Sequence, residues 1–139
     1  MARPSTPAPS HLIPLALLLL AFHGVLAADY VVQRFALGAE ATPALMRFVP
    51  LDALWLKVVW AMAVWLGLVA AVFLMLRDNA SVLLFFAAGV CALAAAVGLF
   101  AASAPGLMVP LPALLAAMVV IPLFGWLYAR GLNRADVLH

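Results

Sequence analysis

The sequence predicts an all-α fold, an integral membrane four-helix bundle with a short interfacial helix in its first loop. Hydrophobic residues make up 70% of the chain and charged residues only 9%, whereas a soluble domain carries about 25% charged residues. The stretch from Asn79 to Ala129 contains no Asp, Glu, Lys, Arg or His. As one helix it would be roughly 75 Å long, but the hydrocarbon core of a bilayer is only about 30 Å thick. We therefore expect two spans there, joined near the Ser-Ala-Pro-Gly sequence at 103–106.

The first span is expected over 12–32, after a disordered tail over 1–10 that is rich in proline. A cleaved signal peptide is the alternative, because Arg3 precedes an apolar core and a cut could fall before Ala28. The apolar character continues past that point to Val32. A retained helix of membrane-spanning length is therefore the preferred interpretation.

The segment 33–52 is the only sizeable loop expected. Thr42 and Pro43 are typical of an N-cap followed by the first helical residue, and Pro50 would end such a helix. Charged residues are interspersed with apolar ones in this loop. The pattern predicts a short amphipathic helix lying at the membrane interface.

Three further spans are expected, over 55–76, 80–102 and 107–129. Aromatic residues and Lys57 cluster at the start of the second span, as interfacial anchors do. A polar turn, Arg77-Asp78-Asn79, separates the second span from the third. One membrane domain over 11–130 and a short tail over 131–139 complete the chain.

The distribution of basic residues predicts the orientation. Both tails and the turn after the second span lie on one side of the membrane, with Arg3, Arg77, Arg130 and Arg134, against Arg34, Arg47 and Lys57 on the other. Because basic residues concentrate on the cytoplasmic side, both termini are expected in the cytoplasm.

Small residues at four-residue spacing predict how the helices pack. Membrane helices associate where small side chains let their backbones approach closely. Such residues occur on the second and third spans, at Ala63, Gly67, Ala71, Ala88, Ala92, Ala96 and Gly98. A second stripe on the third span, through Ala94, Gly98 and Ala102, could instead meet another protomer. Pro122 falls in the middle of the fourth span and predicts a kink there.

Four polar residues form the candidate site: His23, Asp29, Asp52 and Lys57. Ionisable groups within a membrane often have a function, so together they could line a small vestibule on the outer side. The structural alternative is that His23 hydrogen-bonds within the bundle while Lys57 extends to the headgroups.

The sequence gives no reason to expect an enzyme. It contains no catalytic triad, no metal-ligand set and no glycine-rich phosphate loop. The single cysteine, Cys91, cannot form an internal disulfide. No cofactor is expected, and the absence of a basic run argues against nucleic acid as a partner.

The order of segments is similar to that of a known group. The stretch LLLLAFHGVLAADY at 17–30 is followed by a loop, by WAMAVWLGLVAAVFLMLR at 60–77, and by a third span rich in alanine and glycine. This layout resembles small bacterial four-span inner-membrane proteins of the DoxX-like group, some of which carry a sugar-transporter label. The resemblance implies a four-helix membrane fold and assigns no functional residue.

Together with this resemblance, these observations predict a small non-enzymatic integral membrane protein of a bacterial inner membrane. Its expected partners are the lipid bilayer and either further copies of itself or the other subunits of a larger membrane complex. The alternative is a small-solute transporter or channel with a polar site near His23 and Lys57.

Overall fold

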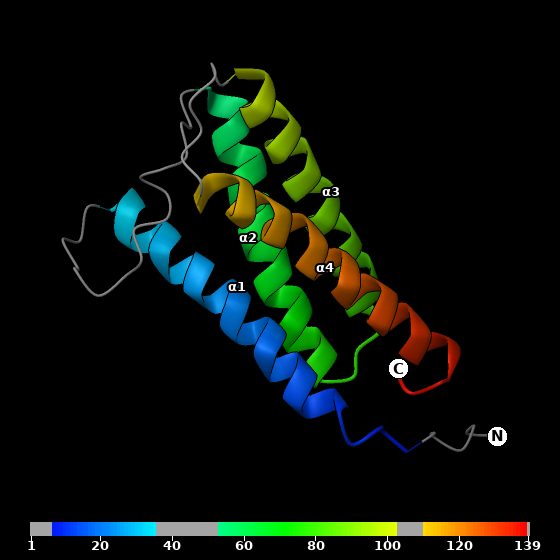
Figure 1. Ribbon diagram of the computed structural model, residues 1–139. Helices are drawn as coiled ribbons and strands as arrows, with labels where there is room; N and C mark the ends of the chain where they lie inside the picture. The colour runs from blue at the N-terminus through cyan, green and yellow to red at the C-terminus, as the bar shows by residue number, and fades with distance from the viewer. Residues whose placement is uncertain (1–6, 36–52, 103–109, 139) are drawn as a thin grey trace.

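The computed structural model describes residues 7–35, 53–102 and 110–138, and all regular structure in these ranges is helical. The helices are α1 (Leu12–Arg34), α2 (Leu54–Met75), α3 (Ala80–Ala102) and α4 (Pro110–Arg134). They run alternately up and down (Figure 1). The interfacial helix expected within 33–52 and the candidate residue Asp52 lie outside the described residues.

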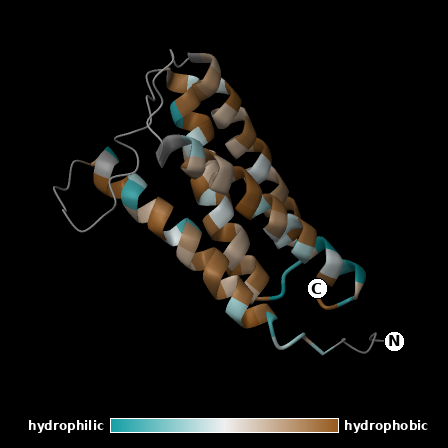
Figure 2. Ribbon diagram, in the orientation of Figure 1, coloured by the Kyte–Doolittle hydropathy of each residue, from teal (hydrophilic) through white to brown (hydrophobic). Residues whose placement is uncertain are grey.

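All four helices are long and apolar enough to cross a membrane, which confirms the predicted fold class. Most of the residues along each helix are hydrophobic (Figure 2). The first three helices closely match the predicted spans, whereas α4 continues past the predicted end at 129 to Arg134. The chain is thus a multi-pass membrane protein.

The helices pack mainly against their neighbours in sequence. The α2–α3 interface is the most extensive, with α4 packed on α3 and α1 packed on α2. The buried side chains form two clusters. One contains Trp60 and Leu99, and the other lies near the chain termini and contains Leu12, Leu74 and Phe85.

The turn between α2 and α3 is closed by backbone hydrogen bonds and a side-chain cap. Arg77 adopts a left-handed conformation with φ of 60°. Its N–H donates to the Leu74 carbonyl (3.1 Å), and the Asp78 N–H donates to the Phe73 carbonyl (2.9 Å). These two bonds form a Schellman motif. Asp78 then caps the start of α3, because its Oδ1 accepts a hydrogen bond from the Ala80 N–H at 2.8 Å.

Replacing Asp78 with alanine is expected to destabilise the protein by about 1 kcal/mol, because the first turn of α3 loses its cap. Thermal unfolding of the purified protein in detergent, followed by circular dichroism, measures the loss. Asp78→Asn keeps an acceptor oxygen and should retain most of the stability. Asn79→Ala, in the same turn with an exposed side chain, is the matched control. Equal losses in Asp78→Ala and Asn79→Ala would contradict the capping role.

The residues after α4 turn back onto the bundle. Asp136 has φ of 53°, and the Val137 N–H donates to the Leu132 carbonyl at 3.0 Å. Val137 and Leu138 are both buried and belong to the same cluster as Leu12. The segment predicted as a tail from 131 therefore contains the last turn of α4 and three residues of the core, Leu132, Val137 and Leu138.

Candidate functional site

His23 is a buried polar side chain of the predicted site. It lies near the middle of α1 and is only 2% exposed. Its Nδ1 lies 2.9 Å from the carbonyl oxygen of Leu19, one turn earlier in the same helix. Because a carbonyl can only accept, Nδ1 donates this bond, and in the neutral ring Nε2 is left as the acceptor nitrogen.

The imidazole ring fills a notch in α2 at Gly67. A Cβ at position 67 would lie 3.0 Å from His23 Cγ and would overlap the ring at Cδ2 and Nε2. Even alanine therefore cannot occupy position 67 without a shift of the ring or of the helix. The missing side chain of Gly67 is what allows α1 and α2 to approach each other at this depth.

A second aromatic ring repeats this arrangement between α3 and α4. Phe85 is completely buried, and a Cβ at Gly125 would lie 2.9 Å from its Cδ1 and Cε1 atoms. The ring centroids of His23 and Phe85 are 6.2 Å apart. We call the two ring–glycine pairs, His23–Gly67 and Phe85–Gly125, the notch contacts. Together they connect all four helices.

Of the other residues of the predicted site, the two that the structure describes, Asp29 and Lys57, lie away from His23 along or around their helices. Lys57 is exposed at the start of α2, and along that helix it lies roughly 15 Å from Gly67, at about 1.5 Å per residue. Asp29 is buried, but it lies roughly 120° from His23 around α1, at about 100° per residue. The structure thus separates His23 from Lys57, and the two do not line a common vestibule.

The small residues predicted to pack are all buried within the bundle. Ala63, Gly67 and Ala71 are on α2, and Ala88, Ala92, Ala96 and Gly98 are on α3. Pro122 is fully buried within α4, which is helical on both sides of it. The kink expected at Pro122 stays a prediction.

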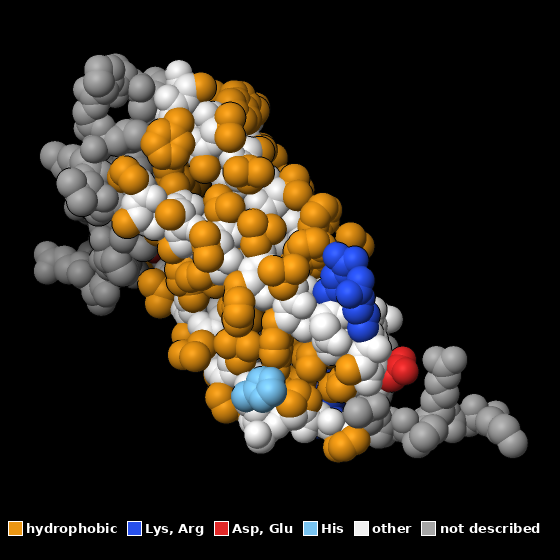
Figure 3. All heavy atoms as spheres, turned by 45° about the vertical axis from the view of Figure 1, so that its right-hand side comes forward, with side chains coloured by type: hydrophobic (Ala, Val, Ile, Leu, Met, Phe, Trp, Pro, Cys, Tyr) orange, Lys and Arg blue, Asp and Glu red, His pale blue; other side chains and the backbone are white. Residues whose placement is uncertain are grey.

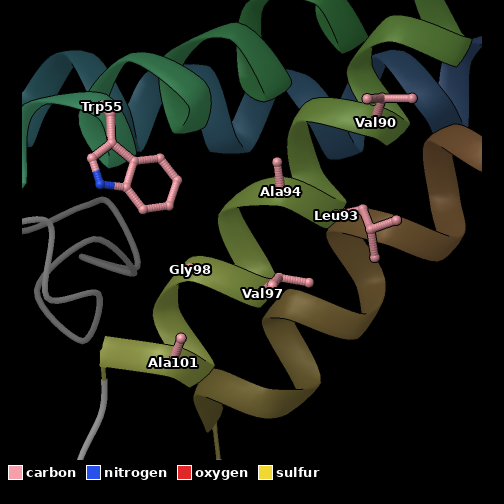
Figure 4. A pocket seen from close by; sticks show the side chains of 7 residues that line it. All are labelled: Trp55, Val90, Leu93, Ala94, Val97, Gly98 and Ala101. Atoms are coloured by element: carbon pink, nitrogen blue, oxygen red, sulfur yellow. The ribbon is translucent and has the colours of Figure 1, made fainter.

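An apolar groove opens on the outer face of α2 and α3. It has a volume of about 770 Å³, and its lining consists of Trp55, Val90, Leu93, Ala94, Val97, Gly98 and Ala101. Figure 4 shows the Trp55 indole extending from α2 towards α3. The indole covers Gly98 so closely that a Cβ at position 98 would overlap it. Among the described residues, none of the predicted polar site lines this groove, which we call the α3 groove.

The described residues offer little for metal or thiol chemistry. Within 7–35, 53–102 and 110–138, no three His, Cys, Asp or Glu side chains come together as a metal site. Cys91 is a free thiol, half-buried on α3.

His23 and Gly67 were each predictable from the sequence as a candidate site residue and a packing residue, but the contact between them was not. Phe85 and Gly125 were missed altogether. One pattern in the sequence could have predicted these contacts. Each glycine lies within an apolar helix, at about the depth in the membrane where another helix has an aromatic or imidazole ring. Comparisons of the chain with protein-family models, with curated proteins and with solved structures found no match.

Proposed function

We propose that this chain is a small non-enzymatic protein of a bacterial inner membrane that works as part of a larger membrane assembly. The observation that carries the proposal is the α3 groove. Most of the small-residue surface of α2 and α3 is used inside the bundle, but Ala94 and Ala101 remain exposed on the outside. A helix face that stays free for close approach is what association in a membrane requires.

The shape of the α3 groove favours a second copy of this chain as the occupant. Ala94 and Ala101 are the small residues exposed in it, Trp55 covers Gly98 between them, and the branched side chains of Val90 and Val97 stand beside them. Small residues next to branched ones let a facing helix come close and make many van der Waals contacts. Other membrane subunits are the alternative occupants.

The number of spans and the distribution of basic residues support a cytoplasmic location for both termini. The even number of candidate spans brings both ends of the chain to one side of the membrane. The slight excess of arginine on that side favours the cytoplasm for both termini. A relationship to the DoxX-like group remains a proposal that rests on the order of the segments.

Small-solute transport, the alternative function, receives less support. The His23 ring is packed against Gly67 and Lys57 lies apart from it. The α3 groove has an almost entirely apolar lining, so it offers few groups that could orient a polar solute.

Cross-linking through the α3 groove tests the proposal. In a Cys91→Ala background, Val97→Cys is expected to form a covalent dimer when membranes are oxidised or treated with a short thiol cross-linker. Val120→Cys on α4 is the matched control, because Val120 is 61% exposed and Val97 is 60% exposed. The mass of the particle in mild detergent, measured without cross-linking, gives the number of copies.

A monomeric mass together with equal, low cross-linking at positions 97 and 120 would overturn self-association. Cross-linking of position 97 to a different protein, with none to a second copy, would assign the groove to another subunit. A dimer that forms through position 120 and not through 97 would move the interface to α4.

A further inference from the structure

Two arginines lie on the exposed face of α4, near its end. Arg130 and Arg134 are one helical turn apart and both are exposed. Towards the middle of the helix the same face continues with Leu127 and Val120, which are also exposed. Figure 3 shows basic side chains gathered in one patch, bordered by hydrophobic ones, near one end of the molecule.

Aromatic rings hold one of these arginines in place. The guanidinium carbon of Arg130 lies 5.4 Å from the centroid of the Trp126 ring. Trp126 in turn packs on Phe86 of α3, with 5.4 Å between the ring centroids. A cation over an aromatic face is attracted by the ring quadrupole. The contact therefore restricts the guanidinium before any ligand arrives, which lowers the ordering cost of binding.

We propose that Arg130, Arg134 and Trp126 form a binding site for the headgroup phosphate of an anionic phospholipid. The planar guanidinium group presents paired N–H donors that match phosphate oxygens. Tryptophan is favoured at the level of the headgroups. The lipid acyl chains lie along Leu127 and Val120, below the two arginines.

Three other charged residues lie near this site. Asp136 follows Arg134 after the end of α4, and Arg77 and Asp78 lie at the same end of the bundle. Asp78 already uses Oδ1 to cap α3. A basic side chain near an anionic membrane surface is attracted to it, and two such side chains on one helix face act together.

Arg34 provides a matched comparison. It also lies in the last turn of a membrane helix and is also exposed. It lies at the other end of the bundle (Figure 1), and no ring of the described residues lies beneath it. If any arginine at a helix end bound lipid equally well, Arg34 would do so too.

Lipid binding to the full chain in mild detergent tests the proposal. Phosphatidylglycerol or phosphatidylcholine with the same acyl chains is added, and native mass spectrometry counts the bound molecules. The wild type is expected to bind phosphatidylglycerol more tightly than phosphatidylcholine. In Arg130→Gln/Arg134→Gln, binding of phosphatidylglycerol should weaken about thirtyfold, which is about 2 kcal/mol at 1.4 kcal/mol per tenfold. Glutamine keeps a good helix propensity, and circular dichroism confirms the fold.

The controls separate this site from general charge attraction. Arg34→Gln should bind phosphatidylglycerol as the wild type does, and Trp126→Leu should weaken binding by a smaller factor than the double change. Inorganic phosphate at the lipid concentration should not displace the lipid, because it lacks the acyl chains. Unchanged binding in the double variant, an equal loss in Arg34→Gln, or full displacement by inorganic phosphate would each overturn the phospholipid site.

Discussion

Replacing Gly67 with alanine is expected to destabilise the four-helix bundle by about 1–3 kcal/mol, the usual cost of overpacking a core. The added methyl group would occupy the position of the His23 ring. The ring must then leave its notch, or α1 must move away from α2. Unfolding of the purified protein by increasing sodium dodecyl sulfate, followed by circular dichroism, measures the change.

Two further variants make this prediction specific to the notch. Gly24→Ala is the matched control, because nothing lies within 4 Å of a Cβ at position 24. His23→Ala/Gly67→Ala removes the ring that the new methyl group would meet. The double variant should therefore lose less stability than the sum of its two single changes. Equal stability of Gly24→Ala and Gly67→Ala would contradict the close contact between the His23 ring and Gly67.

Replacing Phe85 with alanine should lower the free energy of unfolding by about 3 kcal/mol, the lower end of the range for a buried phenylalanine. The lower end applies because lipid is as apolar as the core, so the loss comes mainly from missing packing contacts. Phe85 is completely buried, and it fills the space at Gly125. The cavity would therefore lie between α3 and α4, beside His23.

The adjacent residue supplies the control for this change. Phe86 is 44% exposed and packs on Trp126. Phe86→Ala should lose less than half as much stability as Phe85→Ala, because lipid fills most of the space that it leaves. If Phe85→Ala and Phe86→Ala lost similar stability in the same detergent unfolding assay, the burial of Phe85 at Gly125 would not be what stabilises the bundle.

The positions of the helices along the chain were predictable because the thickness of the bilayer fixes their length. The turn at 77–79 was predictable as well, since three polar residues between apolar runs must lie outside the hydrocarbon. The extension of α4 to Arg134 was missed. Long arginine side chains can reach water from within a helix, so Arg130 does not mark the end of α4.

The contacts between helices were much less predictable. The pairing of His23 with Gly67 depends on the relative depth and rotation of α1 and α2, which neither periodicity nor composition determines. Alanine occurs on so many faces of α3 that its spacing does not distinguish the buried stripe from the outer one. Ala92 and Ala94 illustrate this, because one is buried and the other is exposed.

The hydrogen bond from His23 to Leu19 stays within one turn of one helix, and this has a consequence for biogenesis. Until α1 and α2 have packed against each other in the lipid, the His23 ring has no notch at Gly67 to occupy. An imidazole N–H without a partner would oppose the entry of α1 into the lipid, but the Leu19 carbonyl accepts it immediately. The first helix thus brings its own partner for the polar group, and α2 later supplies only the space into which the ring fits.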